Sequence, residues 1–171
     1  MDKRYLFSFS FRHAMYRPAV RRKVKGGVGA VAVALLQLAC KGHGVGPLKR
    51  VERTLVKKLV TRSRLFDGDW YTANNPEIPL SGEAALDHYV ARGDAEGRSP
   101  MPIFDPEHYN QASGRRARCI NSLVHYYLVG QHRRVSPSPW FDVRYYLQTN
   151  KDVARHCREP ILHYLRHGGQ E

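Results

Sequence analysis

Cysteine and long apolar runs are both scarce in this sequence. The three cysteines, Cys40, Cys119 and Cys157, are an odd number at wide spacing, which excludes a disulfide framework and a zinc site of paired cysteines. The longest apolar stretch, residues 26–40, has 15 residues including three glycines, whereas a membrane-spanning helix needs ~20 apolar residues. A mean hydropathy of −0.53 likewise excludes a polytopic membrane protein. An apolar fraction of 42% excludes a wholly disordered chain.

Acidic residues are nearly missing from the first 64 residues. This segment carries 16 lysines and arginines against two acids, Asp2 and Glu52, whereas residues 65–171 carry 12 basic and 13 acidic residues. The whole excess behind the net charge of +13 therefore belongs to the first 64 residues. Any inference from charge to a nucleic-acid or membrane partner applies to that segment alone.

Residues 1–46 are predicted to be a basic and apolar leader that is partly disordered. A basic cluster ending at Lys25 precedes the apolar stretch, an order typical of a secretory signal, which would lie in residues 19–40. Gln37 does not fit a lipoprotein cleavage motif, and the basic region is unusually long. A short buried or interfacial helix is therefore the favoured alternative. The glycines at 26–29 lack the lysine of a phosphate-binding loop.

Residues 47–64 are predicted to form a basic amphipathic helix. Apolar residues recur along it at steps of three and four and form one stripe: Leu48, Val51, Leu55, Leu59 and Val60. Basic residues fill the rest of the circumference and are the candidate membrane-surface residues: Lys49, Arg50, Arg53, Lys57, Lys58, Arg62 and Arg64. Either the stripe enters the interface of an anionic membrane, or it docks on the downstream domain and the basic face is merely solvated. Nucleic acid is less favoured, because no arginine-glycine, zinc-finger or helix-turn-helix signature accompanies the charge.

Residues 65–171 contain an internal repeat. A Phe-Asp pair recurs at 66–67, 104–105 and 141–142, at spacings of 38 and 37 residues, and a His-Tyr pair followed by a glycine closes each unit. The repeat positions to which we assign structural roles are Asp67, His88, Tyr89, Gly93, Asp105, His125, Tyr126, Gly130, Asp142, His163, Tyr164 and Gly168. The segment therefore divides into about two and a half helical repeats, namely a first unit (65–102), a second unit (103–139) and a third unit (140–171).

Each unit is predicted to be a pair of helices, which gives an all-α fold of stacked helix-pair repeats. The aspartate of Phe-Asp sits where an N-cap belongs, and a short first helix follows it. A second helix begins near Glu83, Asn121 and Glu159, carries the His-Tyr pair, and stops at the glycine, which we expect to be a left-handed C′ residue. The Pro-x-Pro segments at 100–102 and 137–139 force extended connections. So small a helix pair cannot bury its own apolar side, so neighbouring units must stack.

Histidine and tyrosine have the most potential for chemistry, and we expect structural roles for both. Equivalent histidines of stacked units lie about 10 Å apart, too far to share a metal ion, so each is expected to pack at the seam between units and bond a cap or backbone group. Tyrosines at fixed repeat positions are expected in the core rather than on sugar rings. His156, Cys157, His163 and His167 lack a recognised ligand spacing, and Cys119 and Cys157 are expected to be buried. We assign no catalytic residue, no metal and no cofactor.

The motifs of the units, taken together, are Phe-Asp, aromatic-Tyr-Leu, Asn-x-Asp-Val, Leu-His-Tyr, Gly, Glu-Gly-Arg and Pro-x-Pro. The third unit carries the motifs from Phe-Asp to Gly most closely, over residues 140–168. The first unit keeps Glu-Gly-Arg at 96–98 but has Glu77 in place of the aspartate of Asn-x-Asp-Val. The second unit has Ser-Gly-Arg at 113–115 in its middle and Arg-Arg at 133–134 in place of Glu-Gly. This pattern resembles tandem repeats of bacterial surface-polysaccharide proteins, where they commonly precede glycosyltransferase or rhamnan-synthesis-type domains.

The resemblance implies a non-catalytic interaction module associated with the synthesis of bacterial cell-surface polysaccharide. We expect it to be cytoplasmic and peripheral at the inner membrane, with an anionic membrane surface or a polysaccharide-synthesis protein as its partner. Two alternatives stay open. In the first, the chain is the N-terminal part of a glycosyltransferase enzyme whose catalytic domain, which needs considerably more than 171 residues, is absent here. In the second, the basic N-terminal segment binds nucleic acid.

Overall fold

The structure is a computed structural model that describes residues 47–78, 81–114, 120–156 and 159–168. These residues are helical and contain no strand, which confirms the prediction of an all-α fold. The helices are α2 (Pro47–Ser63), α3 (Gly68–Ala73), α4 (Gly82–His88), α5 (Pro106–Ala112), α6 (Ser122–His125), α7 (Val143–Thr149), α8 (Lys151–His156) and α9 (Pro160–His167). The predictions for the leader 1–46 and for Cys119 and Cys157 lie outside the described residues.

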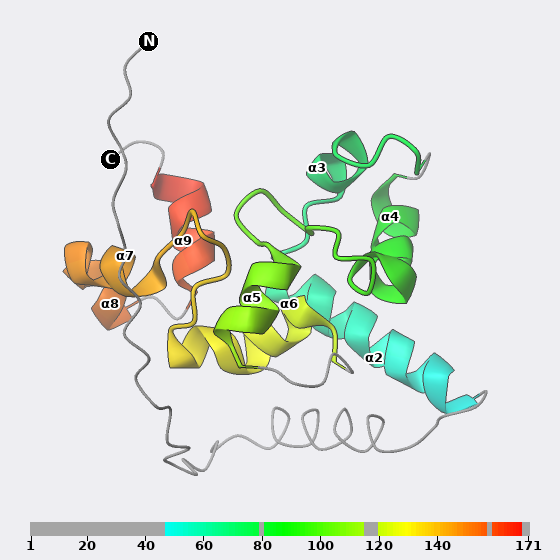
Figure 1. Ribbon diagram of the computed structural model, residues 1–171, viewed down its shortest axis with the longest axis horizontal. Coiled ribbons are helices and arrows are strands. Elements are labelled where there is room, and N and C mark those ends of the chain that lie inside the picture. The colour runs from blue at the N-terminus through cyan, green and yellow to red at the C-terminus, as the bar shows by residue number, and fades with distance from the viewer. Residues whose placement is uncertain (1–46, 79–80, 115–119, 157–158, 169–171) are drawn as a thin grey trace.

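Helices α4 and α6 each continue into a turn of π-helix, named η1 (Tyr89–Gly93) and η2 (Tyr126–Gly130), and a short 3-10 turn, η3 (Gln131–Arg133), follows η2. Figure 1 shows the three units in chain order across the molecule, with α2 running beneath the first two. Each unit thus has a short first helix and a second helix, as predicted, and the third adds α8 between them. Their stacking as a regular array stays a prediction.

Helix α2 packs its apolar stripe against the repeats, where it contacts α6 and η1. Val56, Leu59 and Val60 belong to the hydrophobic core, and Val60 is fully buried. The predicted stripe was wrong at Val51, which is 66% exposed. The buried positions instead follow the three- and four-residue steps from Val56 to the buried Ser63, and Val51 lies about 140° around the helix from Val56. The stripe therefore serves the protein core, as in the second of the two sequence interpretations.

The three predicted N-caps are confirmed. Asp67 accepts a hydrogen bond from the backbone N–H of Trp70 at 2.9 Å, and Asp105 and Asp142 each accept two from the first turns of α5 and α7. The backbone N–H groups of Asp67 and Asp105 donate at 3.0 Å to the carbonyls of Pro100 and Pro137. Each Pro-x-Pro segment therefore returns to the start of its own unit and closes it.

Every unit has a core of one phenylalanine and two tyrosines. In the first unit Phe66 lies 5.4 Å from Tyr71 and 5.3 Å from Tyr89 between ring centroids, and the two tyrosines meet edge to face at 77°. The equivalent trios are Phe104, Tyr109 and Tyr126, and Phe141, Tyr146 and Tyr164. Tyr71, Tyr89, Tyr109 and Tyr126 are at most 1% exposed, so their rings cannot stack on a sugar. The predicted core position was wrong for Tyr164, which is 36% exposed because the second helix of the third unit has no following unit packed against it among the described residues.

The prediction of left-handed glycines at the helix ends was wrong. Gly130 and Gly168 have right-handed φ angles of −62° and −72°, and Gly93 is not among the positive-φ glycines. The left-handed turn comes four residues later, at Gly97 (φ 75°) and at the equivalent Arg134 (φ 56°). Gly93 and Gly130 are needed for a different reason. A Cβ on either one would collide with the hydroxyl oxygen of Tyr71 or Tyr109.

Replacing Arg134 with glycine is expected to stabilise the fold by about 1 kcal/mol. A non-glycine residue in the left-handed region is strained, and glycine removes that strain at some cost in chain entropy. The measurement is the midpoint of denaturant unfolding. The matched control is Arg133→Gly, one residue earlier in η3, which should destabilise. If both variants shifted the unfolding midpoint equally, Arg134 would not be strained in the wild type.

Candidate functional site

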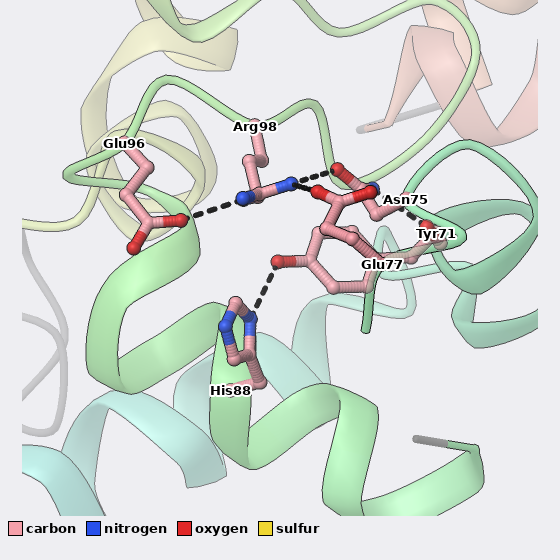
Figure 2. Close-up of polar contacts among 6 residues, drawn as sticks. All are labelled: Tyr71, Asn75, Glu77, His88, Glu96 and Arg98. Atoms are coloured by element: carbon pink, nitrogen blue, oxygen red, sulfur yellow. Dashed lines mark hydrogen bonds and ion pairs between the residues drawn. The ribbon is translucent and has the colours of Figure 1, made fainter. Parts of the chain in front are cut away.

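A tyrosine–histidine hydrogen bond recurs in all three units. The hydroxyl of Tyr71 lies 3.0 Å from Nδ1 of His88, and the equivalent distances are 2.7 Å from Tyr109 to His125 and 2.8 Å from Tyr146 to His163. Figure 2 shows the bond of the first unit. Each bond joins the first helix of a unit to its second helix. The expected partner, a cap or a backbone group at the seam between units, was therefore wrong.

These hydrogen bonds give the repeat histidines a structural role. Burial raises the pKa of Tyr71 to about 12, and it raises the pKa of Tyr89 and Tyr126 as well. The Tyr71 hydroxyl therefore stays protonated at neutral pH, and Nδ1 of His88 is held by its bond to this hydroxyl. Among the described residues, no group of three or more His, Cys, Asp or Glu side chains is placed to hold a metal ion.

Arg98 forms a polar clamp in the first unit (Figure 2). Its Nε donates to Glu96 at 2.6 Å, and its Nη1 donates to the side-chain oxygen of Asn75 at 2.5 Å and also to the carboxylate of Glu77. The amide of Asn75 donates in turn to the carbonyl of Tyr71 at 2.6 Å. Bonding to Arg98 lowers the pKa of both Glu77 and Glu96. The clamp thus ties the end of α3 to the turn after η1.

The clamp explains why two motifs of the first unit are both missing from the second. Asn-x-acid and Glu-Gly-Arg occur together in the first unit and are both lost from the second. In the structure they are the two halves of one set of contacts, so the loss of one half removes the reason for the other. In the sequence, the contact between the two motifs was indicated only by their occurring together in the first unit and being lost together from the second.

Asp94 links the first unit to the second. Its carboxylate accepts from the backbone N–H of Ser122 at 3.1 and 3.0 Å and also from the Ser122 hydroxyl, at the start of α6. The hydroxyl of Tyr89 donates to the same carboxylate at 3.4 Å. Sequence reasoning missed this contact, since Asp94 has no counterpart in the second unit, where Gln131 follows the glycine.

The predicted membrane-surface residues of α2 do not lie on one face. Lys57 is 2.8 Å from Glu83 and 2.5 Å from Asp87, and bonding to Asp87 and Glu83 raises its pKa. Arg53 lies in the same groove, beside α4 and η1, whereas Lys58 is exposed to solvent. Arg62 and Arg64 lie at the other end of α2. The side chains of Lys49 and Arg50 lie outside the described residues.

Arg62 and Arg64 line a cleft of about 400 Å³ between α2, η2 and α9. Arg166, His163, His167 and Glu159 line it from the third unit. The sequence pointed to the two α2 arginines but not to Arg166, because only the fold brings residues 62–64 next to residues 159–167. His163 and His167 are four residues apart in the sequence, and in the structure their ring centroids lie 4.8 Å apart. The side chains of His156 and Cys157 lie outside the described residues.

A comparison with protein-family models, with curated proteins and with solved structures finds no match to this chain. Within the described residues, no helix is both long enough and apolar enough to cross a membrane.

Proposed function

We propose that this chain is a non-catalytic helical-repeat module that attaches to an anionic membrane surface during bacterial cell-surface polysaccharide synthesis. The link to polysaccharide synthesis rests on the resemblance of the motifs in residues 65–171. The non-catalytic role is supported by the repeat tyrosines and histidines, which bond one another inside each unit. A bacterium that lacks this chain should therefore carry altered surface polysaccharide, measured as the sugar composition of its envelope.

The exposure of basic side chains on α2 is the observation that carries the membrane attachment. Arg53, Lys58, Arg62 and Arg64 are all exposed, on more than one side of α2, while Val56, Leu59 and Val60 of the same helix lie in the core. These charges therefore act through the field that they produce together. Attachment then depends on charge and not on insertion of the helix. Each such side chain near an anionic surface contributes about 1 kcal/mol. The attraction falls off within a Debye length, so it weakens as salt is added.

Sedimentation of the full chain with vesicles tests this attachment. Vesicles of phosphatidylglycerol and phosphatidylcholine should bind the chain, vesicles of phosphatidylcholine alone should not, and high salt should release it. The double variant Arg53→Gln/Lys58→Gln should weaken binding by roughly tenfold or more.

Lys57→Gln is the matched control, because Lys57 is already paired with Glu83 and Asp87 and should contribute less than its exposed neighbours. Equal binding to both kinds of vesicle, or equal losses for Lys57→Gln and for the double variant, would overturn the proposal. A footprint on RNA or DNA at physiological salt would favour nucleic acid as the partner instead.

A further inference from the structure

We infer that the cleft between α2, η2 and α9 binds the phosphate or diphosphate group of an organic ligand. Arg62 and Arg64 approach it from the end of α2, and Arg166 approaches from α9. Arginine presents a planar fork of donors that matches the geometry of phosphate oxygens. Three such forks that converge on one concave surface from two distant segments form a binding site for an anion.

Among the described residues, the positive charges of this cleft outnumber its negative charges. It has three arginines against a single carboxylate, that of Glu159. Within the described residues, no carboxylate lies within ion-pair distance of Arg62, Arg64 or Arg166, whereas Lys57 and Arg98 each have two acidic partners. Like charges that crowd a concave surface repel one another and concentrate anions from solution. A bound phosphate would relieve that repulsion.

The cleft is also lined by an imidazole ring and by apolar and aromatic side chains. Nδ1 of His163 is occupied by the hydroxyl of Tyr146, so Nε2 is the ring nitrogen left for a ligand. Leu162 is 8% exposed and Tyr127 is half-buried, and both line the cleft. A volume of about 400 Å³ lies in the range of ligand sites and exceeds what a bare phosphate fills. The site therefore fits a phosphate that carries an organic substituent.

This inference goes beyond the proposed function, and although the two share Arg62 and Arg64, they are tested at different residues. The proposed membrane attachment is tested at Arg53 and Lys58, and the cleft is tested at Arg166. The phosphate group can belong to a soluble molecule or to a lipid headgroup, because the recognition chemistry of the cleft is the same for both.

Titration of the full chain with inorganic pyrophosphate at 0.15 M salt, followed by calorimetry, tests the site. We expect saturable binding that Arg166→Gln weakens by roughly tenfold. Lys58→Gln removes an exposed charge one helical turn from Arg62 that does not itself line the cleft, so it should change the affinity by less than about twofold. Arg166 is exposed at the surface, so its replacement should leave the circular dichroism spectrum of the chain unchanged.

A second arm identifies the source of the phosphate. Vesicles with phosphatidic acid, a phosphomonoester, are compared with vesicles of phosphatidylglycerol at equal charge. If the chain prefers phosphatidic acid and Arg166→Gln abolishes that preference, the cleft binds a lipid headgroup. If the chain binds pyrophosphate but shows no preference for phosphatidic acid, the cleft binds a soluble ligand. Pyrophosphate binding that Arg166→Gln and Lys58→Gln weaken equally, or no binding at all, would overturn the inference. Neither result affects the comparison of Arg53→Gln/Lys58→Gln on vesicles.

Discussion

Replacing Gly93 with alanine is expected to destabilise the fold by about 2 kcal/mol. The added Cβ would collide with the Tyr71 hydroxyl oxygen and would lie 3.2 Å from a ring atom of Tyr89. Both tyrosines are fully buried, so neither ring can move aside without disturbing the aromatic core of the first unit. The free energy of unfolding in denaturant, followed by circular dichroism, measures the effect.

Removing the hydroxyl should rescue much of this loss. Tyr71→Phe alone gives up the bond to His88 and should cost about 1 kcal/mol. In the double variant Gly93→Ala/Tyr71→Phe, the nearest remaining ring atoms lie 3.2 and 3.3 Å from the new Cβ, and small shifts can absorb these contacts. The double variant should therefore be more stable than the sum of the two losses predicts, by at least about 1 kcal/mol. Strict additivity would contradict the close approach.

In the second unit, the equivalent glycine-to-alanine substitution should produce a more severe steric clash. At Gly130 the added Cβ would also lie 2.9 Å from two ring atoms of Tyr109, so Tyr109→Phe should rescue Gly130→Ala only in part. Gly68→Ala is the matched control, since its nearest neighbour, a ring atom of Phe66, is at an ordinary 3.6 Å. That control should leave stability within about 0.5 kcal/mol of the wild type.

Asp94→Ala is expected to destabilise the fold by about 2–3 kcal/mol. The variant removes charge-assisted bonds to the N–H and the hydroxyl of Ser122, which is 1% exposed and so has no water to replace them. It also removes the acceptor for the Tyr89 hydroxyl. Denaturant unfolding measures the loss, and hydrogen exchange at the backbone N–H of Ser122 should accelerate because its acceptor is gone.

Asp69→Ala provides the comparison for Asp94→Ala. Asp69 is an exposed acid in the first turn of α3, so its removal changes the same charge without orphaning a buried donor. The loss should stay below about 1 kcal/mol. If both variants lost the same stability, the link from Asp94 to α6 would have no special role.

Local features of the fold could be predicted from the sequence. The N-caps at Asp67, Asp105 and Asp142 depend on a side chain and on N–H groups within three residues of it, so the signal and the contact lie in the same short segment. The same holds for the helix pairs, because three- and four-residue spacing decides which positions share a face. The all-α fold follows from these elements.

Contacts between segments distant in sequence could not be predicted. The repeat glycine had two physical explanations, a left-handed turn or a close approach, and only the position of Tyr71 over Gly93 decides between them. The partner of His88 was likewise a tyrosine 17 residues away. At α2, periodicity fixed the helix but not which stripe would be buried, since that depends on where η1 and α6 lie. The cleft with Arg62 and Arg166 depends on the same packing.

The position of α2 has a consequence for how the molecule unfolds. In a linear repeat array each unit touches only its neighbours, and the ends can melt independently of the rest. Here one helix of 17 residues contacts both η1 of the first unit and α6 of the second. Loss of either unit would therefore uncover part of the buried face of α2, which includes Val56, Leu59 and Val60. We therefore expect the first two units to melt as a single cooperative block.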